Sequence, residues 1–239
     1  PVNHDQRQGF VPDPCDLVIA SAAIRPDHPE VLAAQARGVE TITYAEALGL
    51  VQEGRTAVSI AGTHGKSTVS SMLAHVLIRC GLDPSFIVGA SCPQIGGGSR
   101  TGAGRIPQGD LAGAPGILVC EACEFNRSFH HHRPHLALIN NVEEDHLDIY
   151  GSLDQIIEAF HGFAARIAPA AEGGRLLIAH EGAHRHVVSA GLACAVSTFG
   201  FNPEADYQVA FDPRTGVSSI ARAGETLASW RVRMPGEHN

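Results

Sequence analysis

A short glycine-rich segment, Gly62-Thr63-His64-Gly65-Lys66-Ser67-Thr68, lies between an apolar run and a stretch with helical periodicity. The run 56–60 predicts a strand, and the later apolar residues recur at intervals of three and four, which predicts a helix. These residues are Val69, Met72, Leu73, Val76, Leu77 and Cys80. In this order, strand, glycine turn and helix form the context in which backbone amides and a helix N-terminus bind phosphate. The segment therefore predicts a phosphate-binding loop within an α/β fold.

Lys66 is the only lysine of the chain, and the other sixteen basic residues are arginine. A lysine at this place in such a loop contacts the β- and γ-phosphates of a nucleotide as a compact charge, and the hydroxyl of Ser67 can ligate Mg²⁺. A chance match is expected in about one in a thousand chains of this composition. We therefore interpret residues 62–68 as a nucleotide site.

Alternating strand and helix patterns along the chain predict a mostly parallel sheet flanked by helices. Further strands are expected at 16–20 (buried), 39–43, 86–89, 117–120, 136–139, 175–179, 193–196, 207–211, 217–221 and 227–233. Further helices are expected at 29–37, 44–51 and 153–167, the last with a capping box from Ser152 and Gln155. Residues 91–116 are expected to form a long loop. The polar, glycine-containing break at 52–55 predicts a boundary between domains 1–52 and 53–239.

Composition excludes several classes of protein. The formal net charge of −8 argues against a nucleic-acid partner, which would need a basic face. No apolar stretch is long enough to span a membrane, and no signal peptide opens the chain, so we expect a cytoplasmic protein. Oligomeric state is left open.

A cysteine pair and a histidine run contain residue types that bind metals, but we expect neither group to hold one. Cys120 and Cys123 have no second cysteine pair to complete a zinc site, so we expect buried thiols. The run His130-His131-His132 is expected to be a solvated loop, because adjacent side chains point in different directions.

Polar side chains follow three of the predicted strands where each strand ends. The Lys66 loop follows 56–60, Glu121 follows 117–120, and the segment 141–148 follows 136–139. In open parallel sheets, ligands bind beyond the carboxyl ends of the strands. Mg²⁺ takes one or two carboxylates together with substrate phosphates. Ser67, Glu121 and the Asp145-His146-x-Asp148 cluster therefore suit an ATP–Mg²⁺ site.

Four motifs, in this order, resemble those of the Mur ligase family of peptidoglycan synthesis. They are Gly62-Thr63-His64-Gly65-Lys66-Ser67, Glu121-Ala122-Cys123-Glu124, Asn141-x-Glu143-x-Asp145-His146-x-Asp148-x-Tyr150 and Pro235-Gly236-x-His238-Asn239. The resemblance implies an ATP-dependent ligase that forms an amide on the carboxylate of UDP-N-acetylmuramate through an acyl phosphate. It also implies that residues 1–52 are the later part of a Rossmann-like UDP-sugar-binding domain and residues 53–239 the central ATP-binding domain. A C-terminal amino-acid-binding domain would be absent, leaving the isolated chain inactive.

The same resemblance implies roles for individual residues. Lys66, Glu121 and His146 would be catalytic, with Lys66 on the β/γ-phosphates. The loop residues Gly62, Thr63, His64, Gly65, Ser67 and Thr68 would surround the phosphates, and His238 and Asn239 would approach the adenine. Ser67 and Glu121 would hold one Mg²⁺ and His146 a second. Glu124 and Asn141 would line the substrate side.

Within the family, two branches remain open. The Glu-Ala-Cys-Glu motif, with Arg127 and Phe129 after it, resembles the members that add L-alanine, so L-alanine is the expected acceptor. Asn140-Asn141 and the segment 81–86 also resemble a recycling ligase that attaches a whole tripeptide. A chain with one lysine cannot belong to the branch that uses a carbamylated lysine after the His146 loop. A nucleotide-binding module without ligase activity is the alternative from a different class.

Overall fold

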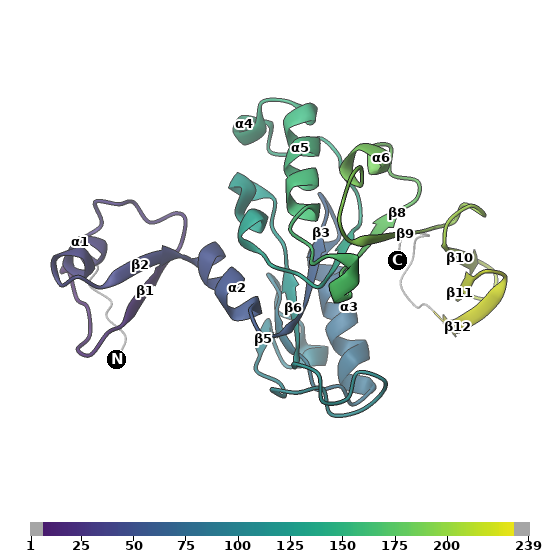
Figure 1. The fold of residues 1–239 in the computed structure, drawn as a ribbon, viewed down its shortest axis with the longest axis horizontal. Helices are drawn as coiled ribbons and strands as arrows, with labels where there is room; N and C mark the ends of the chain where they lie inside the picture. The colour runs from purple at the N-terminus through teal and green to yellow at the C-terminus, as the bar shows by residue number, and fades with distance from the viewer. Residues whose placement is uncertain (1–6, 232–239) are drawn as a thin grey trace.

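The structure of the chain is a computed structural model, and it describes residues 7–231. His238 and Asn239, which were expected to approach the adenine, lie outside the described residues. The described part contains a two-stranded sheet and a ten-stranded sheet. Figure 1 shows the small sheet at one end of the molecule and the large sheet across its middle, joined through one helix.

The small sheet is built from the first β–α–β unit. Strands β1 (Leu17–Ala20) and β2 (Glu40–Thr43) pair in parallel, and helix α1 (Pro29–Ala36) connects them. Helix α2 (Tyr44–Gln52) then leads to the large sheet. The expectation that β1 is buried is wrong, since Leu17 is 37% and Ile19 53% exposed. A sheet of only two strands, with one short connecting helix, leaves most of its surface in water.

The large sheet has the strand order β12-β11-β10-β9-β8-β7-β3-β6-β4-β5. Its strands are β3 (Thr56–Ala61), β4 (Ser85–Ile87), β5 (Ser99–Arg100), β6 (Ile117–Glu121), β7 (Leu136–Ile139), β8 (Arg175–Ala179), β9 (Ala195–Gly200), β10 (Tyr207–Asp212), β11 (Val217–Arg222) and β12 (Glu225–Arg231). Pairing is parallel from β4 through β6, β3, β7, β8 and β9 to β10. Only β5 at one edge and the β10–β11–β12 meander at the other pair antiparallel. The predicted mostly parallel α/β sheet is therefore confirmed.

Helices cover both faces of this sheet. The other helices are α3 (Lys66–Arg79), α4 (Leu147–Tyr150), α5 (Leu153–Ala164) and α6 (Arg185–Val188), with 3-10 turns η1 (Pro93–Ile95), η2 (Phe125–His131) and η3 (Ala170–Glu172). Alternate residues of β3 point to opposite faces: Val58 packs in the cluster that contains Ala74 of α3, and Ala61 in the cluster built around α5. None of the described helices has the length and apolar content needed to cross a membrane.

Helix α5 ends at Ala164, three residues before its expected end, and its apolar face packs on the core. Ile156, Phe160 and Phe163 are buried, and Phe160 meets Phe129 edge-to-face at 5.2 Å between ring centroids. At its N-terminus the backbone N–H of Gln155 donates to the Ser152 hydroxyl at 3.4 Å, which is one half of the predicted capping box. A complete capping box caps α2 instead: Thr43 and Glu46 bond reciprocally. Sequence reasoning missed it, although Thr43-x-x-Glu46 is the usual signature.

Helix α3 follows its predicted stripe only in part, since Leu73 and Leu77 pack against the core whereas other members of the stripe do not. Met72 is 44% and Val76 53% exposed, whereas Ser70 and Ala74 are fully buried. The small side chains of Ser70 and Ala74 let the helix lie close to β6, and Leu73 and Leu77 pack against the same core cluster.

Two further expectations are corrected. The segment 91–116 is not wholly a loop, because it contains η1 and β5, and β5 pairs with β4. The strand expected near 193–196 starts at Ala195 and extends to Gly200.

Candidate functional site

The loop between β3 and α3 adopts a conformation that requires glycine. Gly62 has φ +145°, and a Cβ added there would lie 3.0 Å from the Cβ of Asn140 and 3.3 Å from its backbone nitrogen. Gly65, with φ 81°, is the N-cap of α3, which begins at Lys66. The sharp turn places the backbone of the loop at the N-terminus of a fourteen-residue helix, where the macrodipole favours an anion.

The end of β7 holds this loop in place. The side-chain oxygen of Asn141 accepts from the backbone N–H of His64 at 2.7 Å, and its backbone oxygen accepts from the N–H of Thr63 at 3.1 Å. The Asn140 amide nitrogen donates to the carbonyl of His64 at 3.1 Å. Glu143 donates its backbone N–H to the Thr63 hydroxyl at 3.0 Å. Asn141 therefore lies against the backbone of the glycine-rich loop itself.

Lys66 is folded back onto the loop and toward β6. Its Nζ donates to the carbonyls of Gly62 at 2.7 Å and Thr63 at 3.1 Å, and to Oε1 of Glu124 at 2.9 Å. The Lys66 side chain is 14% exposed and that of Glu124 only 3%. The lysine thus compensates a carboxylate that is almost completely removed from water.

Ser67 and Glu121 form a second pair on the same sheet edge. The Ser67 hydroxyl donates to Oε1 of Glu121 at 2.8 Å, and Oε2 of Glu121 accepts the backbone N–H of Gly89 at 2.6 Å. These bonds fix the carboxylate at the end of β6, beside the first turn of α3. A hydroxyl and a carboxylate held together in this way are oxygen donors of the kind that Mg²⁺ prefers.

The third strand end contributes His146 and Asp145. His146 has φ 49°, a left-handed conformation in which histidine is enriched, and it precedes α4. Its Nε2 lies 3.9 Å from Oε1 of Glu124 and its Nδ1 3.7 Å from Oδ1 of Asp145. The Phe125 ring meets the imidazole edge-to-face at 5.3 Å. Tyr150, on α4, donates its hydroxyl to the backbone carbonyl of Glu124, which ties α4 to the segment after β6.

Together with Glu124, which follows β6, these two residues form a donor set that fits a divalent cation. One ligand atom from each of Glu124, Asp145 and His146 lies within 4.8 Å of the other two. Oε2 of Glu124 is buried and makes no hydrogen bond, although Nζ of Lys66 lies 2.9 Å from it. A buried carboxylate oxygen without a donor is costly unless a cation or donor approaches it.

The structure thus places Lys66, Ser67, Glu121, Glu124, Asn141 and His146 around one edge of the sheet, as their positions after three parallel strands predict. Sequence reasoning did not single out the Lys66–Glu124 ion pair or the proximity of Asp145 to Glu124. The ion pair could not be read from spacing, because 58 residues separate its partners. The sequence showed Asp145 as part of the Asp145-His146-x-Asp148 cluster, but it did not show that Glu124 lies next to it.

The structure changes the interpretation of the cysteine pair and of the histidine run. Cys120 is buried, as expected, and burial raises the pKa of its thiol to about 11. Cys123 is exposed rather than buried, because it lies beyond the end of β6.

His132 is 2% exposed, so the expectation that it lies in a solvated loop is wrong. Its Nδ1 lies 2.9 Å from both Nε2 of Gln52 and the Ser59 hydroxyl, and burial lowers its pKa to about 4.

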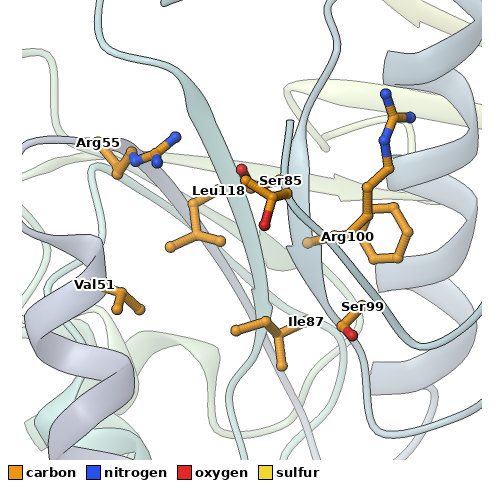
Figure 2. A pocket seen from close by; sticks show the side chains of 9 residues that line it. Val51, Arg55, Ser85, Ile87, Ser99, Arg100 and Leu118 are labelled. Atoms are coloured by element: carbon orange, nitrogen blue, oxygen red, sulfur yellow. The ribbon is translucent and has the colours of Figure 1, made fainter. Parts of the chain in front are cut away.

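Two hollows, each of about 460 Å³, lie beside α2. One opens toward the site and is lined in part by Glu121, Cys123 and Gly89. The other lies away from it, with Val51 of α2 facing Ile87 and Leu118 of the sheet (Figure 2). Its cations are engaged locally: Arg55 donates to the carbonyl of Ala103 at 3.3 Å, and Arg100 pairs with Asp83.

Comparison with known proteins points to one family. The family model for the Mur ligase middle domain matches residues 60–239. A UDP-N-acetylmuramate–L-alanine ligase of Kineococcus radiotolerans is 37% identical over 232 residues, which cover 94% of this chain and 45% of that protein. The same enzyme of Desulfitobacterium hafniense is 33% identical over 227 residues, covering 94% of this chain and 47% of its own. The chain thus spans about half the length of the curated relatives it matches.

Solved structures show the same fold. The UDP-N-acetylmuramate:L-alanyl-gamma-D-glutamyl-meso-diaminopimelate ligase of Neisseria meningitides superposes with a TM-score of 0.79 at 25% identity, covering 93% of this chain and 69% of that one. The UDP-N-acetylmuramate–alanine ligase of Thermotoga maritima gives a TM-score of 0.68 at 23% identity, covering 93% and 48%. With a family model matched over most of its length, and with the four motifs in order, the chain belongs to the Mur ligase family.

Proposed function

We propose that the protein is an ATP-dependent ligase that joins L-alanine to the carboxylate of UDP-N-acetylmuramate in peptidoglycan synthesis. The observation that carries this proposal is the convergence of Lys66, the Ser67–Glu121 pair and the Glu124–His146 pair at one sheet edge of a Mur ligase middle domain. Such an edge offers a phosphate loop, a cation and oxygen donors for a metal within one site.

The loop would bind the triphosphate. The backbone around Thr63 and Gly65 and the N-terminus of α3 favour the negative phosphates, and Lys66 would stabilise charge on the transferring γ-phosphoryl group. A carboxylate oxygen of the muramate would then attack the γ-phosphorus, the bond to ADP would break, and an acyl phosphate would form. The amine of alanine would attack its carbonyl carbon and release phosphate, which gives the amide.

Mg²⁺ fits two places at this edge. Ser67 and Glu121 would hold one ion, and His146 would hold a second. Bound there, the ions would supply charge neutralisation between the triphosphate and the incoming carboxylate. His238 and Asn239 are proposed to approach the adenine, and Glu124 and Asn141 to border the substrate side.

We also propose that residues 1–52 belong to a UDP-sugar-binding domain and residues 53–239 to the ATP-binding domain. The separate two-stranded sheet supports this division, whereas Gln52 at its boundary is buried and bonded to the second unit. The reaction is placed in the cytoplasm, where ATP is available.

A tripeptide acceptor is the second candidate. The solved tripeptide ligase has the higher TM-score of the two structures above, whereas the sequence relatives at 33–37% identity are alanine ligases. The higher sequence identity favours alanine. A nucleotide-binding module without ligase activity is the third hypothesis, and under it the protein would bind ATP and form no amide.

A phosphate-release assay on the full-length protein separates these candidates. With ATP, Mg²⁺ and UDP-N-acetylmuramate, L-alanine should trigger phosphate release and amide formation, and the tripeptide should not. Release only with the tripeptide would establish the recycling reaction. Nucleotide binding without release under either condition would leave only the binding module.

A further inference from the structure

Three protein acceptors engage the Lys66 ammonium group. Its three hydrogen bonds go to the carbonyls of Gly62 and Thr63 and to Glu124. An ammonium group has three donors, so a phosphate can gain a full hydrogen bond from Lys66 only if one of these partners gives way. The two carbonyls belong to the phosphate loop itself. Glu124 is the charged partner, and it comes from the segment after β6.

Glu124 depends strongly on that single cation. Its side chain is 3% exposed, and both carboxylate oxygens lie 2.9 Å from Nζ of Lys66, although Oε2 has no hydrogen bond. Among the described residues, the other basic group within 4 Å is His146, at 3.9 Å. If Lys66 moves to a phosphate, the buried carboxylate loses its compensation and needs a replacement cation.

The replacement site is already assembled. Asp145 and His146 each place a ligand atom within 4.8 Å of a carboxylate oxygen of Glu124, and His146 is the N-cap of α4. Two carboxylates and an imidazole form a donor set suitable for a divalent cation such as Mg²⁺ or Mn²⁺. While Lys66 holds Glu124, its positive charge opposes a cation there.

We propose that Lys66 and a divalent cation are alternative partners of Glu124. Without nucleotide, Lys66 neutralises Glu124 and keeps the Glu124–Asp145–His146 site weak. Nucleotide phosphates draw Lys66 away, and the freed carboxylate joins Asp145 and His146 as a metal ligand. The nucleotide half of this exchange rests on the proposed function. The exchange would make the second metal enter after the nucleotide, because the lysine holds its place until the phosphates arrive.

Mn²⁺ titration of the 239-residue chain without nucleotide, followed by the EPR signal of the free ion, tests the exchange directly. Lys66→Gln should bind Mn²⁺ about tenfold or more tightly than the wild type, because a positive charge next to the site is gone. The double variant Lys66→Gln/Glu124→Gln should lose this gain. Glu144→Gln, which changes an exposed neighbouring carboxylate, is the matched control and should titrate like the wild type. Equal affinity of Lys66→Gln and wild type, or a gain that survives in the double variant, would overturn the proposal.

A second arm keeps Lys66 intact and covers the case in which Lys66→Gln does not fold by circular dichroism. With saturating β,γ-imido-ATP, the wild type should bind two Mn²⁺ per chain and Glu124→Gln only one. Two ions in both proteins would contradict the role of Glu124. Nucleotide binding is measured separately by equilibrium dialysis. Wild type that binds no nucleotide contradicts the nucleotide half of the exchange in this chain, and the nucleotide-free titration then decides the lysine–metal competition by itself.

Discussion

His132 should make the stability of this protein depend on pH in the mildly acidic range. The imidazole is buried between α2 and β3, where Nδ1 lies 2.9 Å from Gln52 and Ser59. Burial disfavours the charged form, and the pKa falls from its ordinary 6.5 to about 4. In the unfolded chain the imidazole has its ordinary pKa, so between pH 6.5 and 4 the unfolded state binds the proton more readily.

The sign and size of the effect follow from these two pKa values. The neutral buried histidine contributes stability that is fully present above pH 6.5 and is lost as the pH falls toward 4. At about 1.4 kcal/mol per pKa unit, the wild type should lose roughly 2–3 kcal/mol from this group between pH 7 and pH 4.5. That is a large share of the stability of an ordinary domain.

Urea unfolding followed by circular dichroism at pH 7 and pH 4.5 measures this loss. His132→Gln removes the titrating group and should lower the pH-dependent loss by roughly 2–3 kcal/mol, whatever its effect at pH 7. His186→Gln removes an exposed histidine and serves as the matched control. An equal loss in His132→Gln and the control would refute the reasoning, because the pH dependence would then come from other groups.

Three further predictions concern packing, capping and thiol access. Phe160→Ala should lower the free energy of unfolding by about 3–5 kcal/mol, whereas Met72→Ala, on the exposed face of α3, should lower it by less than about 1 kcal/mol. Equal urea midpoints for the two variants would contradict the burial of Phe160. Thr43→Ala removes the capping box of α2 and should lower the free energy of unfolding by about 1 kcal/mol. An unchanged melting temperature would contradict this role of the cap. In the native protein a maleimide should label the exposed Cys123 and spare the buried Cys120, and labelling should quicken as the pH rises, because the thiolate is the form that reacts. Mass spectrometry of the digested protein measures the order of labelling, and the reverse order would contradict the exposure of Cys123.

Much of the fold was predictable because its signals are local. The glycine turn before Lys66, the periodicity of α5 and the alternation of strands and helices each act within a few residues. The convergence of Lys66, Glu121 and His146 was predictable for a different reason: the carboxyl ends of parallel strands meet at one edge of a sheet.

The parts that sequence reasoning missed depend on long-range packing. His132 looked like a loop residue among other histidines, and only its contact with Gln52, 80 positions earlier, makes it a core residue. The buried face of α3 was predicted from the spacing of its apolar residues, which identified Leu73 and Leu77 but missed the fully buried Ser70 and Ala74. Neither the partner of Glu124 nor the exposure of Cys123 follows from spacing alone.

Lys66 is the residue on which the proposed nucleotide site depends, and its removal tests that site most directly. Isothermal titration of Mg-ATP into the 239-residue chain should show binding for the wild type. Binding should be about tenfold weaker or absent for Lys66→Ala, since a charge-assisted hydrogen bond to phosphate is lost. Arg55→Ala, which removes a cation lining the distant hollow, should bind like the wild type. Equal affinity of Lys66→Ala and wild type, with circular dichroism showing both folded, would contradict the assignment of this loop as the phosphate site.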